Sequence, residues 1–394
     1  MTTGGFSSKR LARVRELLEG HVESGFVPGA VAVLARRGEV HVETTGTLAF
    51  EGAGAGVPMA DDTICRLASM TKPIVAACAM ALVDDGTLRL DDPIDDLIPE
   101  LADMTVLASP HGPLDDTVPA KRPITLRDLL TYTWGIGVTP TKPGRVPIVD
   151  AVNALDYTST DTWIRGLGAL PLAHQPGEHW MYDTASNVIG LLVARATGMS
   201  FGEAFRERIC EPLGMEDTAF SVGGDDIARF ATAYQRDNSD TGEPVVDDGP
   251  DGRWSRPPAF ESGGGGLVST ARDFFAFASA LHAGGSHRGQ RVLSPQSVEL
   301  MTSDHLTPEQ KAAPGFWLGK ELGWGFGMSV LTHTSRFGPS AGSYGWSGFY
   351  GTAWYNDPAE DLTAIFFLQR AHSGDQRLPL WRDLWTATYQ AIDN

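Results

Sequence analysis

The stretch RLASMTKPIVAACAM, residues 66–80, holds both a strong helix pattern and the least expected polar residue of the chain. Residues 63–86 are apolar almost all round and end at Gly86, which predicts a central, buried helix. The chain has 25 arginines but six lysines, and one of those lysines, Lys72, falls inside this helix. An unpaired ammonium in an apolar core is strongly unfavourable, so we expect Lys72 to have partners or a function.

Ser69 lies three positions before Lys72, and side chains at this spacing share one face of a helix. Pro73 has no amide hydrogen and suits a first helical turn, which places Ser69 at the positively polarised N-terminus. A serine is a weak nucleophile until a base removes its proton, and a desolvated lysine can have its pKa lowered toward that task. Ser-x-x-Lys alone should occur about once by chance in a chain of this length, but its place in an apolar helix favours catalysis.

The residues before this helix have simple patterns. Spaced leucines and valines predict an amphipathic helix over 8–24. Residues 30–46 form two β-rich runs on either side of Arg37-Gly38, which is typical of a hairpin. The chain therefore opens with a helix and a pair of strands.

Strand patterns return only near the end of the chain, at 325–331, 348–355 and 362–369, ahead of a closing helix at about 379–392. Strands from both ends must share one sheet if neither end is to leave unpaired edges. This predicts a sheet domain made of 1–100 together with 260–394.

The residues between these two parts, 101–259, indicate short helices and long polar loops, and predict an inserted, mainly helical domain. The Pro/Gly/Asp-rich stretch 236–258 is typical of an exposed loop. The predicted fold class is therefore α/β of the α+β type, with an antiparallel sheet flanked by helices.

Composition excludes several classes of protein. With 394 residues, 42% of them hydrophobic, the chain can bury a sizeable core. Its net charge of −18 repels phosphate backbones and anionic lipid, so neither nucleic acid nor a membrane is an expected partner. Three scattered cysteines do not suit a disulfide framework, and the first 25 residues carry no signal-peptide run, so we expect a cytoplasmic location.

No cofactor and no metal are expected. His174 and His179 are five residues apart, as are His282 and His287, which misses the i, i+4 spacing of helical metal ligands. The glycine run 263–266 lacks the strand and helix that frame a phosphate-binding loop. Nucleotide and metal chemistry are therefore not implied.

A rival nucleophile, Ser340, lies in Gly338-Pro339-Ser340-Ala341-Gly342, which matches the G-x-S-x-G elbow of α/β-hydrolases. That elbow requires a strand before it and a helix after it, whereas loop residues and strand patterns follow here. The histidine that should come later in the chain is available only as His372, in a polar loop. A glycine-rich turn explains this motif better.

Five strings carry a resemblance to a known family: RLASMTKPIVAACAM at 66–80, PITLRDLLTYTWGIG at 123–137, WMYDTASNVIGLLVARATG at 180–198, GGGGLVSTARDFFAF at 263–277 and GWSGFYGTAWYNDP at 345–358. Together they resemble the serine β-lactamase and penicillin-binding-protein superfamily, specifically its class C branch and the related family VIII carboxylesterases. The resemblance covers nearly the whole chain. It implies an antiparallel sheet flanked by helices beside an all-helical region, in agreement with the division above.

The resemblance also assigns roles. Ser69 and Lys72 correspond to the first motif, and Tyr182 to the second, so the phenol of Tyr182 could take the serine proton and later protonate the leaving group. The family's Tyr-x-Asn becomes Tyr182-Asp183-Thr184 here, so the asparagine that contacts the amide side chain of β-lactams is missing. Asp183, the middle residue of this motif, is a candidate substrate-binding residue.

The third motif, Lys-Thr-Gly in β-lactamases, corresponds to Trp346-Ser347-Gly348. The indole removes the cation that would pair with a substrate carboxylate and adds an apolar wall. The resemblance further implies an oxyanion hole formed by the backbone N–H groups of Ser69 and Phe349. Tyr132 and Trp134, which stand where the family usually shows a His-Thr-Ser-Gly type string, are candidate substrate-binding residues.

These features predict a serine hydrolase that cleaves short-chain, uncharged carboxylic esters through an acyl-serine intermediate. A β-lactamase or D-amino-acid peptidase is the first alternative, disfavoured by the missing third-motif lysine. An acyltransferase of the same fold is the second, and a non-catalytic scaffold the third. The expected partner is a small-molecule ester, and the sequence leaves the oligomeric state open.

Overall fold

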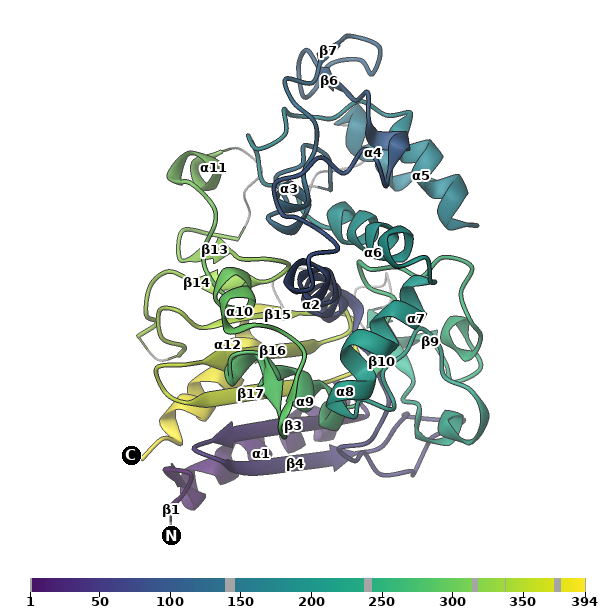
Figure 1. The fold of residues 1–394 in the computed structure, drawn as a ribbon. Coiled ribbons are helices and arrows are strands. Elements are labelled where there is room, and N and C mark those ends of the chain that lie inside the picture. The colour runs from purple at the N-terminus through teal and green to yellow at the C-terminus, as the bar shows by residue number, and fades with distance from the viewer. Residues whose placement is uncertain are drawn as a thin grey trace.

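The computed structural model describes residues 2–138, 146–236, 243–313, 318–336, 338–371 and 377–393. Its largest element is a seven-stranded antiparallel sheet in the order β13-β14-β15-β16-β17-β3-β4 (Figure 1). These strands span Leu322–Trp324 (β13), Ser329–Leu331 (β14), Tyr344–Ser347 (β15), Thr352–Asp357 (β16), Leu362–Phe367 (β17), Gly29–Arg36 (β3) and Glu39–Gly46 (β4). Both ends of the chain thus contribute to one sheet, and the predicted fold class is confirmed.

The predicted hairpin is β3 and β4. Its turn residues Arg37 and Gly38 both have positive φ, 51° and 80°, as a type I′ turn requires. Strand β3 pairs on its other side with β17, so the first strand of the chain lies next to the last. This pairing holds the two ends of the chain together.

Helices cover both faces of the sheet. Helix α1 (Ser8–Glu23) and helix α12 (Arg377–Gln390) pack against one face, where they form a cluster with Ala32 and Leu34 of β3. The alternate residues Val31 and Val33 belong to the larger core on the opposite face. Helix α9 (Ala271–His282) contacts β17, β3 and β16 on that side.

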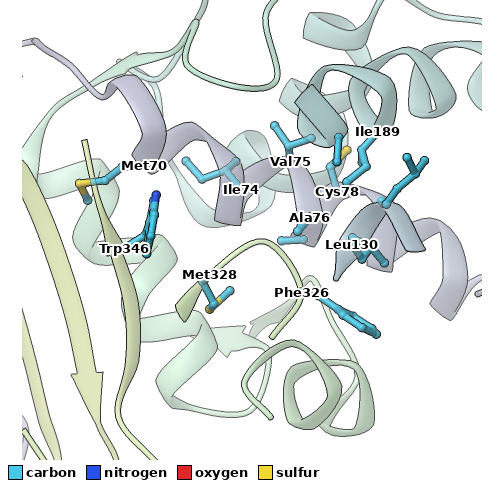
Figure 2. Packing of buried hydrophobic residues seen from close by; sticks show 14 of the residues in the cluster. Met70, Ile74, Val75, Ala76, Cys78, Leu130, Ile189, Phe326, Met328 and Trp346 are labelled. Carbon is cyan, nitrogen blue, oxygen red and sulfur yellow. The ribbon is translucent and has the colours of Figure 1, made fainter. Parts of the chain in front are cut away.

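Helix α2 (Thr71–Asp84) runs through the middle of this larger core, between the sheet and helix α6 (Thr184–Thr197), as Figure 1 shows. All of its residues from Thr71 to Leu82 are buried. In Figure 2 its side chains pack among others that come from distant parts of the chain, including Leu130, Ile189, Phe326 and Met328. The predicted central helix is confirmed, but it begins at Thr71 rather than near residue 63, because strand β5 (Cys65–Arg66) and the 3₁₀ turn η1 (Ala68–Met70) come first.

Two predictions for the late strands need correction. The predicted strand at 325–331 is a strand only from Ser329 (β14), and residues 325–328 are the turn that joins it to β13, an unpredicted strand. The predicted strand at 348–355 begins later, at Thr352, and an unpredicted strand, β15, precedes it. Residues 348–351 are instead the turn between β15 and β16.

The prediction of an exposed loop at 236–258 needs correction at residues 244–248, which form a strand. Strands β8 (Ala233–Arg236) and β9 (Pro244–Asp248) pair as a hairpin, and Asp248 at the end of β9 is 5% exposed. Residues 237–242 lie outside the described residues.

The remaining helices are mostly short, as predicted for 101–259. They are η2 (Pro99–Leu101), α3 (Leu126–Leu130), α4 (Pro147–Asn153), α5 (Thr160–Gly168), α7 (Phe201–Phe205), the π-helical η3 (Arg206–Cys210), α8 (Glu211–Leu213), η4 (Gly224–Arg229), η5 (Arg253–Ser255), α10 (Pro295–Met301) and α11 (Pro308–Ala312). The minor strands are β1 (Thr2–Thr3), β2 (Phe6–Ser7), β6 (Thr105–Leu107), β7 (Thr117–Pro119), β10 (Val268–Ser269), β11 (Ser286–His287) and β12 (Gln290–Arg291). The division into two domains stays a prediction.

Within the described ranges, no single helix has the length and apolar character to cross a membrane. One pair, Thr184–Thr197 with Phe201–Leu213, would pass on length and composition, but it is bent by 83°.

Candidate active site

Ser69 lies in the 3₁₀ turn η1, directly before α2. Its Oγ accepts a hydrogen bond from Nζ of Lys72 at 3.1 Å. The three-residue spacing therefore brings the two groups together, as the sequence indicated. The turn is held from the side, because Leu67 N–H donates to the carbonyl of Leu267 at 2.9 Å.

Lys72 is fully buried, and its ammonium is surrounded by polar partners. Nζ donates to the carbonyl of Gly264, lies 2.5 Å from Oδ1 of Asp183, and is 4.8 Å from the ring centre of Tyr182. Burial is the largest influence and lowers the pKa of Lys72, but the attraction of Asp183 and Tyr182 outweighs it, so the pKa is raised. The expectation of a lowered lysine pKa is thus corrected, and Lys72 is a cation at neutral pH.

Tyr182 and Asp183 stand at the start of α6, where the backbone makes an unusual turn. Thr184 N–H donates to the Tyr182 carbonyl at 3.3 Å, which closes a three-residue turn around Asp183. Asp183 has φ 83° and ψ −67°, values of a γ-turn that is rare and strained. Such strain persists where the surroundings fix it, and here the Asp183 carboxylate is paired with Lys72.

Trp346, on β15, reaches the same site from the sheet. Its Nε1–H donates a hydrogen bond to the phenol oxygen of Tyr182 at 2.7 Å, and the two rings are 5.5 Å apart. Trp346 is 6% exposed, so the indole that the sequence predicted to be an apolar wall is also a buried hydrogen-bond partner of Tyr182. A donor at this position stabilises negative charge on the phenol oxygen.

The end of β15 approaches the turn that holds Ser69. A Cβ on Gly348 would collide with the Leu67 carbonyl, so only glycine allows the two backbones to come this close. Thr352 Oγ1 donates to the same carbonyl at 3.0 Å and adds to this contact. Ser347, half-buried, is the last residue of β15.

Phe349 follows Gly348, and its ring is exposed. Among the described residues, neither the Ser69 nor the Phe349 backbone N–H has a hydrogen-bond partner. Both donors therefore remain available to a ligand, as an oxyanion hole requires.

A cleft of about 510 Å³ opens beside these groups. Asp183 and residues 264–266 form its catalytic side, and a Cβ on Gly265 would lie 3.6 Å from the carbonyl carbon of Ala68. Its outer walls are aromatic and are formed by Tyr157, Phe220, Trp254 and Phe260. We call this the aromatic cleft.

The beta-lactamase family model matches residues 14–387, which is most of the chain.

The chain belongs to the beta-lactamase family.

Similar proteins cover nearly the full length. The Mycobacterium tuberculosis (strain H37Rv) protein Rv1367c is 40% identical over 91% of this chain and 88% of its own length. Esterase EstB of Burkholderia gladioli is 31% identical over 92% of this chain and 91% of its own length. The solved structure of EstCE1, described as a hydrolase with promiscuous acyltransferase activity, has a TM-score of 0.79 at 25% identity and covers 98% of each chain. The family therefore includes esterases and acyl-transferring enzymes.

Two residues that the sequence predicted to bind substrate, Tyr132 and Trp134, do not line the aromatic cleft. Tyr132 and Trp134 are fully buried, and the Tyr132 hydroxyl is hydrogen-bonded to Ser186 while its ring packs 4.8 Å from Trp324. Neither ring has exposed surface, so neither lines the cleft, and the Tyr132 ring instead lies 5.9 Å from the ring of Tyr182. The sequence placed both residues near the site but could not distinguish a ring packed in the core from a ring that contacts the substrate.

Sequence reasoning missed the role of the glycine run 263–266. A Cβ on Gly263 would collide with the Ser186 carbonyl, and Gly264 offers its carbonyl to Lys72. Asn187 holds this run in place, because its Oδ1 accepts from Gly264 N–H at 2.8 Å. Four consecutive glycines were the available signal, since such a run indicates close approach of backbones.

The rival serine has none of these surroundings. Ser340 lies in the connection between β14 and β15, where its N–H donates to Asp357. His372, its only available histidine, lies outside the described residues.

The histidine pairs hold no metal cluster. His174 and His179 stack at 3.8 Å, and burial lowers the pKa of His174 to about 4. In the described part of the chain, no group of three potential metal ligands comes together.

Proposed function

We propose that the protein is a serine carboxylesterase that cleaves short-chain, uncharged esters through an acyl group on Ser69. One observation carries this proposal: the Ser69 hydroxyl accepts a hydrogen bond from the buried Lys72, which itself contacts Tyr182 and Asp183. A hydroxyl, a cation and a phenol meeting at one helix start are the groups that acyl transfer requires.

The charged state of Lys72 assigns the proton to Tyr182. A cationic lysine cannot accept the Ser69 proton, so that role falls to the oxygen of Tyr182, which accepts a hydrogen bond from Trp346 and lies beside the Lys72 ammonium. In acylation the Ser69 oxygen bonds to the ester carbon, its proton passes to Tyr182, and the carbon–oxygen bond to the alcohol breaks. Tyr182 then returns the proton to the departing alkoxide.

In deacylation, water takes the place of the alcohol. Tyr182 removes a proton from the water as its oxygen attacks the acyl carbon, and the proton returns to Ser69 as the acid leaves. In both halves the N–H groups of Ser69 and Phe349 receive the developing oxyanion.

The charges around the site favour neutral substrates. The third motif supplies indole in place of a cation, and the one nearby ammonium, Lys72, already faces the Asp183 carboxylate. A substrate carboxylate would lie close to Asp183, and Arg253, a cation that lines the aromatic cleft, is already paired with Asp247 and Asp248. This is the physical reason that an esterase is preferred here to a β-lactamase or a peptidase.

Acyl transfer to an alcohol is the second candidate. The aromatic cleft adjoins Asp183 and the glycine run and has room for an apolar alcohol that could compete with water. Adding increasing concentrations of an aryl alcohol during hydrolysis of p-nitrophenyl butyrate tests this, because transfer yields the new ester at the expense of butyric acid.

The proposed function is tested by Ser69→Ala beside Ser340→Ala. We expect Ser69→Ala to abolish ester hydrolysis, a loss of several orders of magnitude, and Ser340→Ala to retain most of it. A fluorophosphonate probe, followed by peptide mass mapping, should label Ser69. If both variants fold and lose activity equally, Ser340 of the G-x-S-x-G motif would be supported as the nucleophile instead. If the fluorophosphonate probe labels no serine of the wild-type protein, the non-catalytic scaffold would be supported.

A further inference from the structure

Strand β9 ends in two aspartates, Asp247 and Asp248, that reach two different parts of the candidate active site. The pairing is irregular here, because Ala233 pairs with Asp248 whereas Tyr234 pairs with Val246, which leaves Asp247 as the extra residue of a β-bulge. A bulge re-aims a side chain, so this short segment can hold two sets of partners at once. Both carboxylates are largely shielded, with 19% and 3% of their side chains exposed. This segment lies in the stretch that the sequence predicted to be an exposed loop.

Asp248 holds the chain that leads to Ser69. Its Oδ2 accepts from Nε of Arg66 at 3.0 Å and also from Nη2, and Arg66 is fully buried. The guanidinium also donates to the Ala231 carbonyl at 2.6 Å and lies 4.0 Å from the ring centre of Phe230. Arg66 is three residues before Ser69, so this fixed group belongs to the segment that leads directly into the 3₁₀ turn.

Asp247 holds the chain that carries Phe349. Its Oδ2 accepts a hydrogen bond from the hydroxyl of Tyr350, the residue next to Phe349. Tyr350 is 5% exposed, and its carbonyl accepts from Arg370 N–H at 2.9 Å. Both the side chain and the carbonyl of the residue that follows Phe349 are thereby held.

Arg253 joins the two aspartates into one unit. Its backbone N–H donates to Oδ1 of Asp248 at 2.8 Å, and its Nη2 donates to Asp247 at 2.8 Å and to the Tyr350 hydroxyl at 3.2 Å. A Cβ on Gly252 would collide with the Asp248 carboxylate, so the turn is folded directly onto it. We call Asp247, Asp248 and Arg253 the acidic clamp.

We propose that the acidic clamp is a positioning device for the oxyanion hole, which sets the separation of the Ser69 and Phe349 N–H groups. The proposal rests on the proposed function, since it requires acyl transfer at Ser69. The two donors come from segments about 280 residues apart, and the clamp is tied to both of them. An oxyanion hole acts through donors fixed in advance, so displacement of one donor lowers the rate without a matching loss of substrate binding.

The test compares Tyr350→Phe and Asp247→Asn with a control, Tyr344→Phe. Tyr344 is also a buried tyrosine, and its hydroxyl accepts from Asn356 at 3.1 Å, away from the clamp. For each variant, kcat and KM for p-nitrophenyl butyrate, the Kd of an arylboronic acid and the thermal midpoint are measured. The boronic acid adds to the serine as a tetrahedral anion and so reports on the oxyanion hole.

We expect both clamp variants to lose about tenfold in kcat and in boronic acid affinity, with KM within about twofold of wild type. The control, Tyr344→Phe, should lose thermal stability to a similar degree but keep the kcat and the boronic acid affinity of wild type. Clamp variants that match wild type, or a control that loses as much as they do, would overturn the proposal. If Tyr350→Phe does not fold, Asp247→Asn decides, because it preserves size and shape.

The two proposals fail in different ways. Wild-type protein that is not labelled at Ser69 by the fluorophosphonate probe would overturn the proposed function and this inference with it. Labelling at Ser69, combined with unchanged kcat and boronic acid affinity in the clamp variants, would overturn this inference alone.

Discussion

The starts of helices α2 and α6 meet at Lys72, and they build the candidate active site in different ways. Both helices are apolar and buried, and each follows a non-glycine residue with positive φ, Ala68 at 47° and Asp183 at 83°. At α2 the two chemical groups, Ser69 and Lys72, are neighbours on one helical face. At the start of α6, Tyr182 and Asp183 instead interact with residues of other elements, Trp346 of β15 and Lys72 of α2.

This difference separates chemistry that is set locally from chemistry that is set by the fold. The hydrogen bond between Lys72 and Ser69 needs only a helical turn. Tyr182, by contrast, accepts a hydrogen bond from Trp346 of the sheet, 164 residues away. Changes at α2 should therefore act on the reaction directly, and changes around α6 should act through charge and position.

The largest effect is expected at Lys72. Both Lys72→Ala and Lys72→Arg should lower kcat for p-nitrophenyl butyrate by roughly a thousandfold or more, because arginine keeps the charge but its planar fork does not fit a site shaped for an ammonium. Lys311→Ala, which removes a lysine paired with Asp304, is the control and should keep its activity. If Lys72→Arg retained more than about a tenth of kcat, charge alone would be sufficient at this position.

A smaller loss is expected at Trp346, the partner of Tyr182. Trp346→Phe removes the Nε1–H donor and should lower kcat about 10-fold to 100-fold, the value of one hydrogen bond to a charged group. Trp354→Phe is the matched control. Trp354 lies on β16, the strand next to β15, and its Nε1–H donates to Asn356 of the same strand at 2.9 Å. Equal kinetics in the two variants would mean that the Trp346 hydrogen bond does not assist Tyr182.

The sequence predicted the local parts of the site well. Ser69 and Lys72 followed from spacing, and the γ-turn residue Asp183 was predicted to bind substrate. The sequence could not reveal that Asp183 pairs with Lys72, because that contact joins residues 111 positions apart and depends on how α6 packs on α2. The hydrogen bond from Trp346 to Tyr182 also joins distant parts of the chain, so the sequence predicted only the apolar character of Trp346 and not its role as a donor.

The fold shows the same division. Helix α1 and the β3–β4 hairpin have strong local patterns and were predicted closely. Strand β15 was not, because its Gly345 and Ser347 have little strand preference, and pairing with β16 makes it a strand. A Cβ on Gly345 would collide with the Trp354 carbonyl, so the glycine reflects that close pairing rather than a turn.

The next effect concerns how activity depends on pH. Asp183→Asn removes an attraction that raises the pKa of Lys72, while the burial that lowers it remains, so the pKa of Lys72 should fall. If catalysis needs the lysine charged, the alkaline limb of the kcat/KM profile moves to lower pH, with a loss smaller than that of Trp346→Phe. A gain in activity at neutral pH would show the opposite, that neutral Lys72 is the base.

The smallest effect is a change in preference for substrate charge. Because the Asp183 side chain is 40% exposed and borders the aromatic cleft, it should repel a carboxylate on the substrate only weakly. Asp183→Asn should therefore raise kcat/KM for a succinyl half-ester, relative to a neutral butyrate ester, by about threefold. Asp115→Asn removes the same charge from an exposed position after β6 and should leave this ratio unchanged. Because both esters are measured on one protein, the ratio is independent of any general loss of rate. An unchanged ratio in Asp183→Asn would mean that its carboxylate serves Lys72 alone, and that the absence of a third-motif cation accounts for the preference.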